Sequence, residues 1–254
     1  MTNYLITGVS SGIGRELAKR LVEGGDYVIG VARRKELLKE LKKELKESQN
    51  FNFISADLSR KDSWKKIVGL IHLAKFIPDI IIFNAAIFEK DYLNEKLNFA
   101  QMRRSFEINF FSVLKGFEAL KEIAKPKTQF IFISTSSALK GSGAEGVGYP
   151  ASKSALSIAF ESLYQKYKSK YCLKIIYFGP IRTEMLPSLS IVTPVLSKNQ
   201  AVEKIVKVIH SKKVITYTPW YLFLFLKLIK ILPGSMYLTI ISLIDILHLK
   251  SHKK

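Results

Sequence analysis

Cysteine is nearly absent from this chain of 254 residues, which contains only Cys172. One thiol cannot form a disulfide within the chain, so a disulfide-stapled secreted domain is excluded and a reducing compartment is favoured. Histidine is also scarce, and its four residues do not cluster with other ligand types: His72, His210, His248 and His252. The sequence therefore predicts no metal site.

A leader segment and a membrane-spanning run are lacking too. Met1 is followed almost at once by Tyr4-Leu5-Ile6, without a basic segment and a longer apolar run, so we expect no signal peptide. No stretch reaches the ~18–20 uninterrupted apolar residues that a spanning helix needs. We therefore expect a cytoplasmic protein. The 48% of hydrophobic residues exclude a mainly disordered chain, and the length suits one large α/β domain or two small ones.

Acidic residues are few, because 21 Asp and Glu against 40 Lys and Arg give a net charge of +19. Such a balance suits nucleic acid, an anionic membrane or an anionic cofactor. The segment from Lys198 to Lys254 has ten Lys against two acidic residues and is the most apolar part of the chain. This combination favours the surface of an anionic membrane, with a merely solvated basic face as the alternative. No nucleic-acid reading motif is present, so we expect no such partner.

Short apolar stretches typical of strands alternate with stretches of helical period. The predicted strands are Leu5-Ile6, Tyr27–Val31, Phe51–Ser55, Ile80–Phe83, Phe130–Ser134 and Leu173–Phe178. The predicted helices are Ile13–Glu23, Arg34–Glu47, Arg103–Ile123 and Ala151–Tyr167. Strict alternation predicts an α/β fold with a doubly wound parallel sheet, covered by helices on both faces.

Residues 214–254 break this alternation, so we expect a domain over residues 1–213 followed by a basic, apolar helical appendage. Trp220–Leu232 is apolar almost all round, Pro233-Gly234 interrupts it, and Met236–Leu249 is apolar again. Residues 219–254 are too interrupted to span a membrane, and we expect them to lie in its interface, with Lys227 and Lys230 reaching the headgroups. This would place the protein peripherally on the inner face of the membrane. The alternative is a helical pair that caps the domain or packs in a dimer.

A glycine-rich turn, Thr7-Gly8-Val9-Ser10-Ser11-Gly12-Ile13-Gly14, follows the first strand and opens the first helix. Glycines there allow a tight turn and a close approach of main-chain N–H groups to a pyrophosphate, and the helix dipole adds positive charge. The second strand ends in Ala32-Arg33-Arg34, where a carboxylate would bind a ribose 2′-hydroxyl. Guanidinium groups suit a 2′-phosphate, which favours NADP(H) over NAD(H). The alternative is that Arg33 and Arg34 only begin a basic helix.

Tyr149 and Lys153 are four residues apart in Tyr149-Pro150-Ala151-Ser152-Lys153. If one helix contains both, their side chains share a face. A nearby ammonium favours the phenolate, so we expect Lys153 to lower the pKa of Tyr149 and make it a proton donor and acceptor near neutral pH.

With these motifs the chain resembles the classical short-chain dehydrogenase/reductase family over about residues 2–212. The matching motifs are Thr7-Gly8 with Gly12-Ile13-Gly14, Asp57-Leu58, Asn84-Ala85-Ala86, Asn109, Ser136, Tyr149 with Lys153, and Gly179-Pro180-Ile181-Arg182-Thr183. The resemblance implies a Rossmann-type catalytic domain that binds NADP(H), and a homodimer or homotetramer.

The resemblance also implies individual roles. Tyr149 would act as general acid/base on the carbonyl oxygen. Lys153 would hold the nicotinamide ribose, and Asn109 would anchor a water that passes protons to it. Ser136 would orient the carbonyl, with Ser137 as runner-up among several adjacent hydroxyls. The implied cofactor-binding residues are Gly8, Ser10, Ser11, Gly12, Ile13, Gly14, Arg33, Arg34, Asp57, Leu58, Asn84, Ala85, Tyr149, Lys153, Pro180, Ile181 and Thr183.

Two positions depart from the family pattern. Ala86 replaces a glycine and adds one methyl group near the cofactor. Phe178 replaces a proline and would place a ring next to the nicotinamide loop. Neither change removes a catalytic group.

The segment after Thr183 resembles the family's lid over the substrate and is apolar, with Met185, Leu186, Leu189, Ile191 and Val192. Together with the appendage it suggests a hydrophobic, lipid-like carbonyl or alcohol as the substrate. One alternative is a reductase of a small soluble carbonyl, and another is a non-catalytic cofactor-binding regulatory module at the membrane surface. A sugar-nucleotide epimerase is disfavoured by the three residues between Gly8 and Gly12 and by the short chain.

Overall fold

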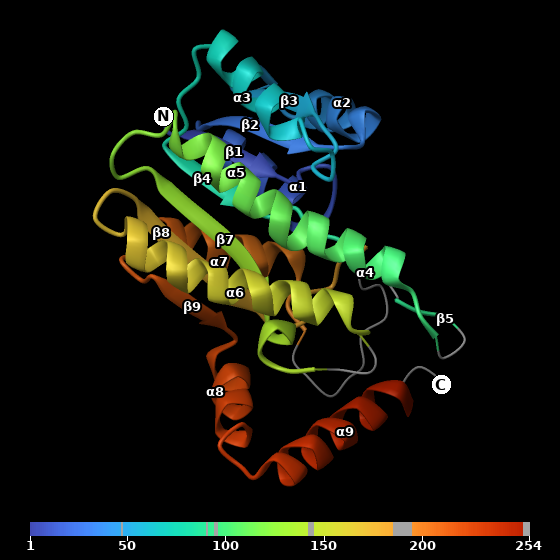
Figure 1. Cartoon of the computed structure of the whole chain (residues 1–254). Helices are drawn as coiled ribbons and strands as arrows, with labels where there is room; N and C mark the ends of the chain where they lie inside the picture. Colours follow the sequence, from blue (N-terminus) through green and yellow to red (C-terminus); the bar gives the residue numbers. More distant parts are fainter. Residues whose placement is uncertain (47, 90, 94–95, 142–144, 185–194, 251–254) are drawn as a thin grey trace.

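A parallel β-sheet forms the centre of the computed structural model, which describes residues 1–46, 48–89, 91–93, 96–141, 145–184 and 195–250 (Figure 1). The strands of this sheet lie in the order β3-β2-β1-β4-β7-β8-β9, and all neighbouring pairs are parallel. They are β1 (Asn3–Thr7), β2 (Tyr27–Ala32), β3 (Phe51–Ser55), β4 (Ile80–Phe83), β7 (Gln129–Thr135), β8 (Cys172–Phe178) and β9 (Ile215–Thr218). The predicted doubly wound parallel sheet is confirmed.

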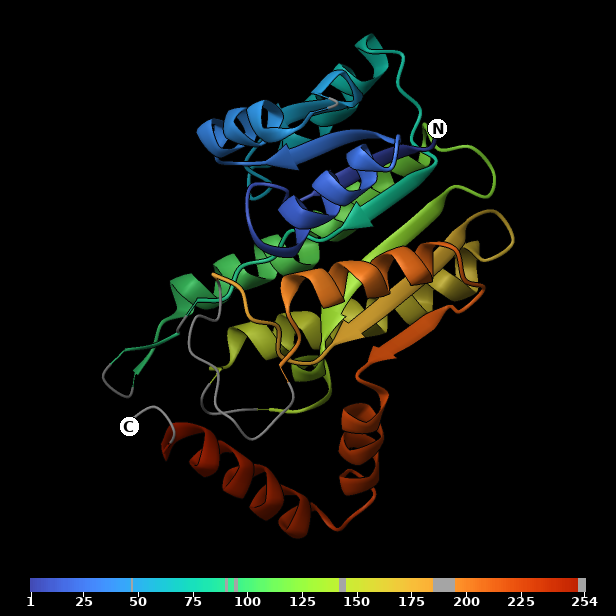
Figure 2. The same ribbon diagram turned by 180° about the vertical axis from the view of Figure 1, so that it is seen from behind.

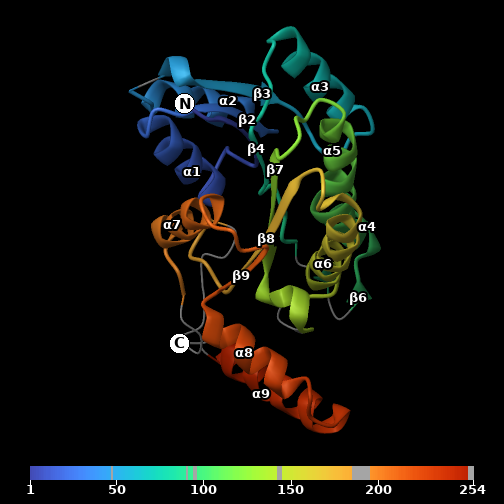
Figure 3. The ribbon, with the colours of Figure 1, turned by 90° about the vertical axis from the view of Figure 1, so that its left-hand side faces the viewer.

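Helices cover both faces of the sheet, as the edge-on view shows (Figure 3). One face carries α1 (Gly12–Glu23), α2 (Lys35–Glu44) and α7 (Lys198–Ile209), and the other carries α3 (Ser63–Leu73), α5 (Ser112–Lys121) and α6 (Gly148–Tyr167). The strands are apolar on both sides because each side is buried. Within β1, Leu5 packs into the core beneath α3, α5 and α6, whereas its neighbour Ile6 packs into the core beneath α1, α2 and α7.

The direction of winding reverses between β1 and β4. The chain leaves β3 at one edge of the sheet and returns through α3 to β4 on the other side of β1. In such a sheet the crevice outside the carboxyl ends of the strands at this switch point binds ligands. The glycine turn at the end of β1 therefore lies at the crevice where sheets of this type bind nucleotides.

The predicted helix Arg103–Ile123 is in fact three helical segments. They are α4 (Phe99–Phe106), a π-helical turn (Glu107–Phe111) and α5. A π-turn holds one residue more than an α-turn, and here it contains the fully buried Asn109. The small hairpin of β5 (Tyr92–Leu93) and β6 (Lys96–Leu97) and helix α3 were not foreseen. Helix α2 ends at Glu44, short of the predicted Glu47, because Leu45 is extended and buried.

The appendage begins later than the predicted boundary at residue 214, since β9 pairs with β8 and completes the sheet. It consists of α8 (Trp220–Ile229) and α9 (Gly234–Lys250), which extend from the carboxyl-end edge of the sheet (Figure 2). The two helices meet through Leu226, Ile229 and Ile241. Within the described residues no helix is long and apolar enough to cross a membrane.

Candidate active site

Asn84 fastens the glycine turn to β4. Its Nδ2 donates to the main-chain oxygens of Thr7 at 3.0 Å and Gly8 at 3.4 Å. The hydroxyl of Thr7 accepts from the N–H groups of Asn84 and Ala85 at 3.1 and 3.0 Å. Gly8 has φ +79°, and a Cβ there would lie 2.8 Å from the Cα of Ala85. The ends of β1 and β4 are thus joined by hydrogen bonds. They can approach this closely because Gly8 has no side chain.

The turn leaves its main chain open at Gly12. A Cβ on Gly14 would overlap the main-chain oxygen of Gly8, so this side of the turn is closed. At Gly12, which has φ +59°, a Cβ would meet, among the described residues, the side chains of Glu184 at 3.7 Å and Thr183 at 3.9 Å. Gly12 itself adds no side chain at the start of α1, where a pyrophosphate needs close access to the main chain, so the glycines fit a dinucleotide.

Arg34 lies over the glycine turn. Its guanidinium donates to the hydroxyl of Ser10 at 3.1 and 2.8 Å and to that of Ser11 at 2.5 Å. Helix α2 begins only at Lys35, and Arg34 precedes it in an extended conformation. Arg34 is therefore the N-cap residue of α2 and also contacts the glycine turn.

Arg33 lies near Asp57, with 4.0 Å between a guanidinium nitrogen and Oδ2. Burial raises the pKa of Asp57, but hydrogen bonds from Ser59 and the charges of Arg33 and Arg60 outweigh it, so the pKa lies below its usual value. Asp57 is therefore ionised at neutral pH. Leu58 beside it is buried. Asp57 and Leu58 follow β3, and Arg33 follows the neighbouring strand β2.

Tyr149 and Lys153 both lie in α6, as the proposed pairing needs. Burial lowers the pKa of Lys153 to about 8, and its Nζ donates to the main-chain oxygen of Ile133 at 3.0 Å. Burial also raises the pKa of Tyr149, and the charge of Glu145 adds to this. The expectation that Lys153 lowers the pKa of Tyr149 is wrong for this arrangement, because the ammonium is turned to Ile133 and burial dominates.

Three residues with hydroxyl groups, Thr135, Ser136 and Ser137, follow one another at the end of β7. Ser136 and Ser137 are both buried in a 3₁₀ turn, Ser136–Leu139. The hydroxyl of Thr135 lies 3.3 Å from that of Ser137, and it also hydrogen-bonds Tyr149 and thereby counteracts part of the rise in the pKa. Among the described hydroxyl groups, that of Thr135 thus acts on the pKa of Tyr149, and Ser136 is the next residue along the chain.

Asn109 links the π-turn to α6. Its Oδ1 accepts from the N–H of Ile87 at 2.8 Å, and its Nδ2 donates to the oxygen of Ile87 at 2.9 Å and to the hydroxyl of Ser152 at 3.1 Å. Ser152 in turn donates to the main-chain oxygen of Tyr149 at 2.8 Å. Both amide hydrogens of Asn109 are engaged, so a water held by this side chain has to donate to Oδ1.

The segment after β8 pairs with the residues before α7. The N–H of Arg182 donates to the oxygen of Leu196 at 2.9 Å, and the N–H of Leu196 donates to the oxygen of Pro180 at 3.0 Å. Ile181 between them is buried. Phe178 is also buried, in the core cluster beneath α1 and α7 that contains Ile181.

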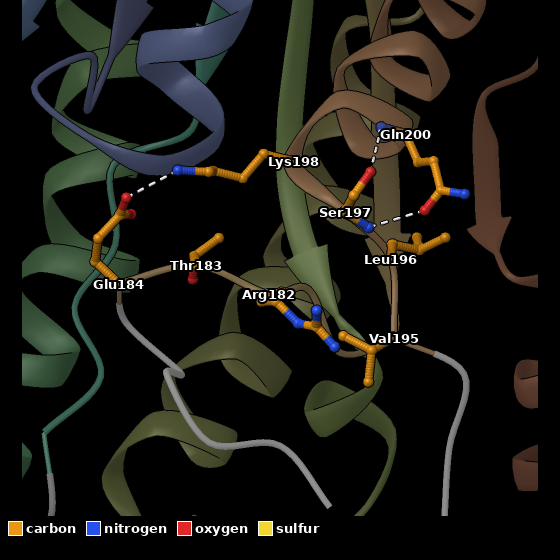
Figure 4. A pocket seen from close by; sticks show the side chains of 8 residues that line it. All are labelled: Arg182, Thr183, Glu184, Val195, Leu196, Ser197, Lys198 and Gln200. Atoms are coloured by element: carbon orange, nitrogen blue, oxygen red, sulfur yellow. Dashed lines mark hydrogen bonds and ion pairs between the residues drawn. The ribbon is translucent and has the colours of Figure 1, made fainter. Parts of the chain in front are cut away.

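A cavity of about 440 Å³ lies between these two segments (Figure 4). Its lining residues are Arg182, Thr183, Glu184, Val195, Leu196, Ser197, Lys198 and Gln200. The side chains of Glu184 and Lys198 reach toward one another, with 2.9 Å between Oε1 and Nζ. Because Glu184 and Thr183 also approach Gly12, the cavity adjoins the glycine turn. The predicted lid residues Met185, Leu186, Leu189, Ile191 and Val192 lie outside the described residues.

Comparison with known proteins identifies the family. The sequence profile of the short chain dehydrogenases matches residues 2–191. This chain is a short-chain dehydrogenase. The family consists of oxidoreductases that bind a nicotinamide cofactor and act on small molecules.

Two relatives of this short-chain dehydrogenase are similar over most of its length. The NADPH-dependent pterin aldehyde reductase of Arabidopsis thaliana is 32% identical over 185 residues, which cover 72% of this chain and 76% of the relative. Epidermal retinol dehydrogenase 2 of Homo sapiens is 31% identical over 265 residues, which cover 96% of this chain and 82% of the relative. A short-chain dehydrogenase from Sphingobium yanoikuyae in complex with NADPH superposes with a TM-score of 0.73. It is 19% identical, covers 86% of this chain and 88% of its own, and shares the fold.

Sequence reasoning missed two groups next to Tyr149 in this short-chain dehydrogenase. The ring of Phe88 meets that of Tyr149 edge-on, with 5.1 Å between centroids. Asp91 is fully buried and accepts from the N–H groups of Val147 and Gly148 at the start of α6. Both groups lie in the segment after β4, where no periodic pattern marks them. An acidic residue far from a helix start in sequence gives no capping signal.

Proposed function

We propose that this short-chain dehydrogenase transfers hydride between NADP(H) and the carbonyl or alcohol of a hydrophobic, lipid-like substrate. The observation that carries the proposal is the placement of Tyr149 and Lys153 on one helix beside Thr135 and Ser136, at the same sheet edge as the glycine turn. NADPH, when bound, supplies the hydride.

Tyr149 is the general acid in this proposal. Burial raises its pKa, so the phenol is protonated at neutral pH and can donate a proton to a carbonyl oxygen that gains hydride. Ser136 and Thr135 orient the same oxygen. The ammonium of Lys153, which has a pKa of about 8, holds the nicotinamide ribose and restores the proton to Tyr149. Asn109 fixes the start of α6 through Ser152 and holds the relay water at Oδ1.

The preference for NADP(H) rests on Arg34 and Arg33. Arg34 is already oriented over Ser10 and Ser11, and a guanidinium binds a phosphate through two hydrogen bonds. The remaining ligands in this proposal shape the turn or border it: Gly8, Gly12, Ile13, Gly14, Asp57, Leu58, Asn84, Ala85, Pro180, Ile181 and Thr183. The similarity to an NADPH-dependent relative supports the same preference.

The hydrophobic substrate and a membrane surface are proposed from the appendage. Large apolar side chains are exposed on α8, α9 and the turn between them, including Trp220 at 67%, Ile231 at 81% and Leu238 at 62%. Exposed aromatic and aliphatic groups among lysines suit the interface of an anionic membrane. The appendage extends from the same edge of the sheet as the active site (Figure 1), so a bound membrane would lie on the substrate side. The similarity to a human relative named for retinol, a largely apolar alcohol, covers nearly the whole chain and supports this class.

The test measures NADPH oxidation against aldehydes and ketones of increasing chain length, with and without phosphatidylserine vesicles. Turnover that rises with chain length and with vesicles, and that disappears in Tyr149→Phe, is the expected result. Ile231→Asp combined with Leu238→Asp should remove vesicle binding and the vesicle effect. Leu73→Asp, a change at a 79% exposed leucine on the opposite end of the domain, is the matched control.

A small polar carbonyl is the second candidate substrate. It is favoured by the charged lining of the cavity, which contains Arg182, Glu184 and Lys198, and by the similarity to a pterin aldehyde reductase. Turnover restricted to small carbonyls and indifferent to vesicles would select this candidate. The appendage would then be a structural or dimer element.

A further inference from the structure

The ion pair between Glu184 and Lys198 crosses the space in front of the glycine turn. Glu184 lies at the end of the segment that follows β8, and Lys198 is the first residue of α7. Their side chains extend across the cavity toward one another, with 2.9 Å between Oε1 and Nζ (Figure 4). The second carboxylate oxygen, Oε2, lies 3.7 Å from the position of a Cβ on Gly12. The carboxylate therefore pairs with the cation and lies beside the open part of the turn.

This carboxylate is ionised at neutral pH. Its hydrogen bond with Lys198 lowers the pKa of Glu184, and its own main-chain N–H and the charges of Lys198 and Arg34 act in the same direction. One negative charge thus lies beside Gly12 and interacts with two cations. The main chain at Gly12 together with nearby cations is also an environment that binds phosphate groups.

A dinucleotide bound at the turn brings a second anion to this place. Its pyrophosphate lies at the start of the first helix in this type of fold, within reach of the main chain at Gly12. Two like charges this close repel each other, so the carboxylate and the pyrophosphate cannot share the position. Lys198 can bind either anion, because its Nζ is within hydrogen-bond distance of the position that the carboxylate occupies.

We propose that Lys198 is a ligand of the cofactor's pyrophosphate and that Glu184 competes with the pyrophosphate for it at the position beside Gly12. When the cofactor binds, the pyrophosphate replaces the carboxylate of Glu184 as the partner of Lys198. Glu184 thereby lowers the affinity for the dinucleotide. The inference rests on the proposed cofactor and adds two residues that the family motifs do not contain.

The test is a direct titration of NADPH and NADH, followed by cofactor fluorescence and without substrate. Glu184→Gln keeps the shape and removes the charge, and it should lower the Kd of both cofactors about fivefold, a factor at the upper end for one exposed charge pair. Lys198→Met in the Glu184→Gln background should raise the Kd by a similar factor. Both effects should shrink in 1 M salt, where the screening length is about 3 Å.

The matched control is Glu118→Gln, which removes the same charge from an exposed pair with Lys121 on α5. It should leave both Kd values unchanged and so exclude an effect of net charge. Thermal unfolding checks that each variant is folded, which we expect because both side chains of the pair are partly exposed.

Three results would overturn the proposal. An unchanged or higher Kd in Glu184→Gln would show that the carboxylate does not compete. An unchanged Kd on adding Lys198→Met would remove the lysine from the site. An effect on NADPH but not on NADH would assign Lys198 to the 2′-phosphate instead. Cofactor binding that follows the expected pattern without any turnover would refute the proposed function and leave this inference standing.

Discussion

Lys153 should make the folded protein less stable at neutral pH, and Lys153→Met should reverse this. The side chain is 4% exposed and its pKa is lowered to about 8 from 10.5 by burial. Between these two pH values the unfolded chain binds a proton at Lys153 and the folded chain does not, so the free energy of unfolding rises with pH. Over that interval the free energy of unfolding rises by about 3 kcal/mol. At pH 7 the folded protein is therefore less stable by this amount than it would be with an unperturbed lysine.

Methionine has a similar length and no charge to bury. Its loss of the hydrogen bond to Ile133 costs about 1 kcal/mol. We therefore expect Lys153→Met to be more stable than the parent chain by about 1–2 kcal/mol at pH 7, with the difference shrinking toward pH 10. The same variant should lose hydride transfer, so a stabilising change would abolish activity.

Urea unfolding at pH 7 and pH 10 measures both quantities. The matched control is Lys174→Met, because Lys174 is also buried, but its Nζ donates to the main-chain oxygens of Val208, Ile209 and Ser211 at the end of α7. Removing that donor leaves three carbonyls without it, and we expect a loss of about 2–4 kcal/mol. A Lys153→Met variant that is less stable at pH 7, or whose advantage is the same at both pH values, would refute the reasoning.

Four further changes test the site and its supports. Tyr149→Phe should reduce kcat by about 10²–10⁴-fold, since the proton donor is lost; a kcat equal to that of the parent chain would contradict this. Arg34→Ala should raise the Kd of NADPH about 10–100-fold and that of NADH much less, because only NADPH carries a 2′-phosphate; equal losses would contradict this. Asp91→Ala should lower the free energy of unfolding by about 1–2 kcal/mol, as measured in urea, because two N–H groups of α6 lose their acceptor. Gly14→Ala should destabilise by at least ~2 kcal/mol, since its Cβ would overlap the oxygen of Gly8, and an unaltered urea midpoint would show that the turn can move.

The sheet and the glycine turn could be predicted because their signals are local. Each strand that was predicted is a short apolar run, and the glycines, Arg34, Tyr149 and Lys153 lie near the ends of strands or helices. Strand β9 was missed because Ile215–Thr218 is short and only partly apolar, and it lies on the edge of the sheet. The π-turn was missed because one extra residue inside a helix leaves the apolar period almost unchanged.

The electrostatics of the site could not be predicted from spacing. Tyr149 and Lys153 share a helix as expected, yet the ammonium bonds Ile133 on a strand that is 20 residues earlier in sequence. Glu184 and Lys198 are 14 residues apart and meet only because the segments after β8 and before α7 pair through Leu196. Such contacts depend on tertiary packing, which the spacing of residues along the sequence does not reveal.

The attachment of the glycine turn to Asn84 has a consequence for the newly made chain. The glycine motif ends at Gly14, but Asn84, whose amide fastens it, is synthesised 70 residues later. At ordinary synthesis rates of 5–20 residues per second, that delay is roughly 3.5–14 s. Throughout that time the motif is complete in sequence and its turn has no β4 to close against. The chain therefore becomes able to bind a dinucleotide when β4 forms beside β1, and not when the glycine motif has been synthesised.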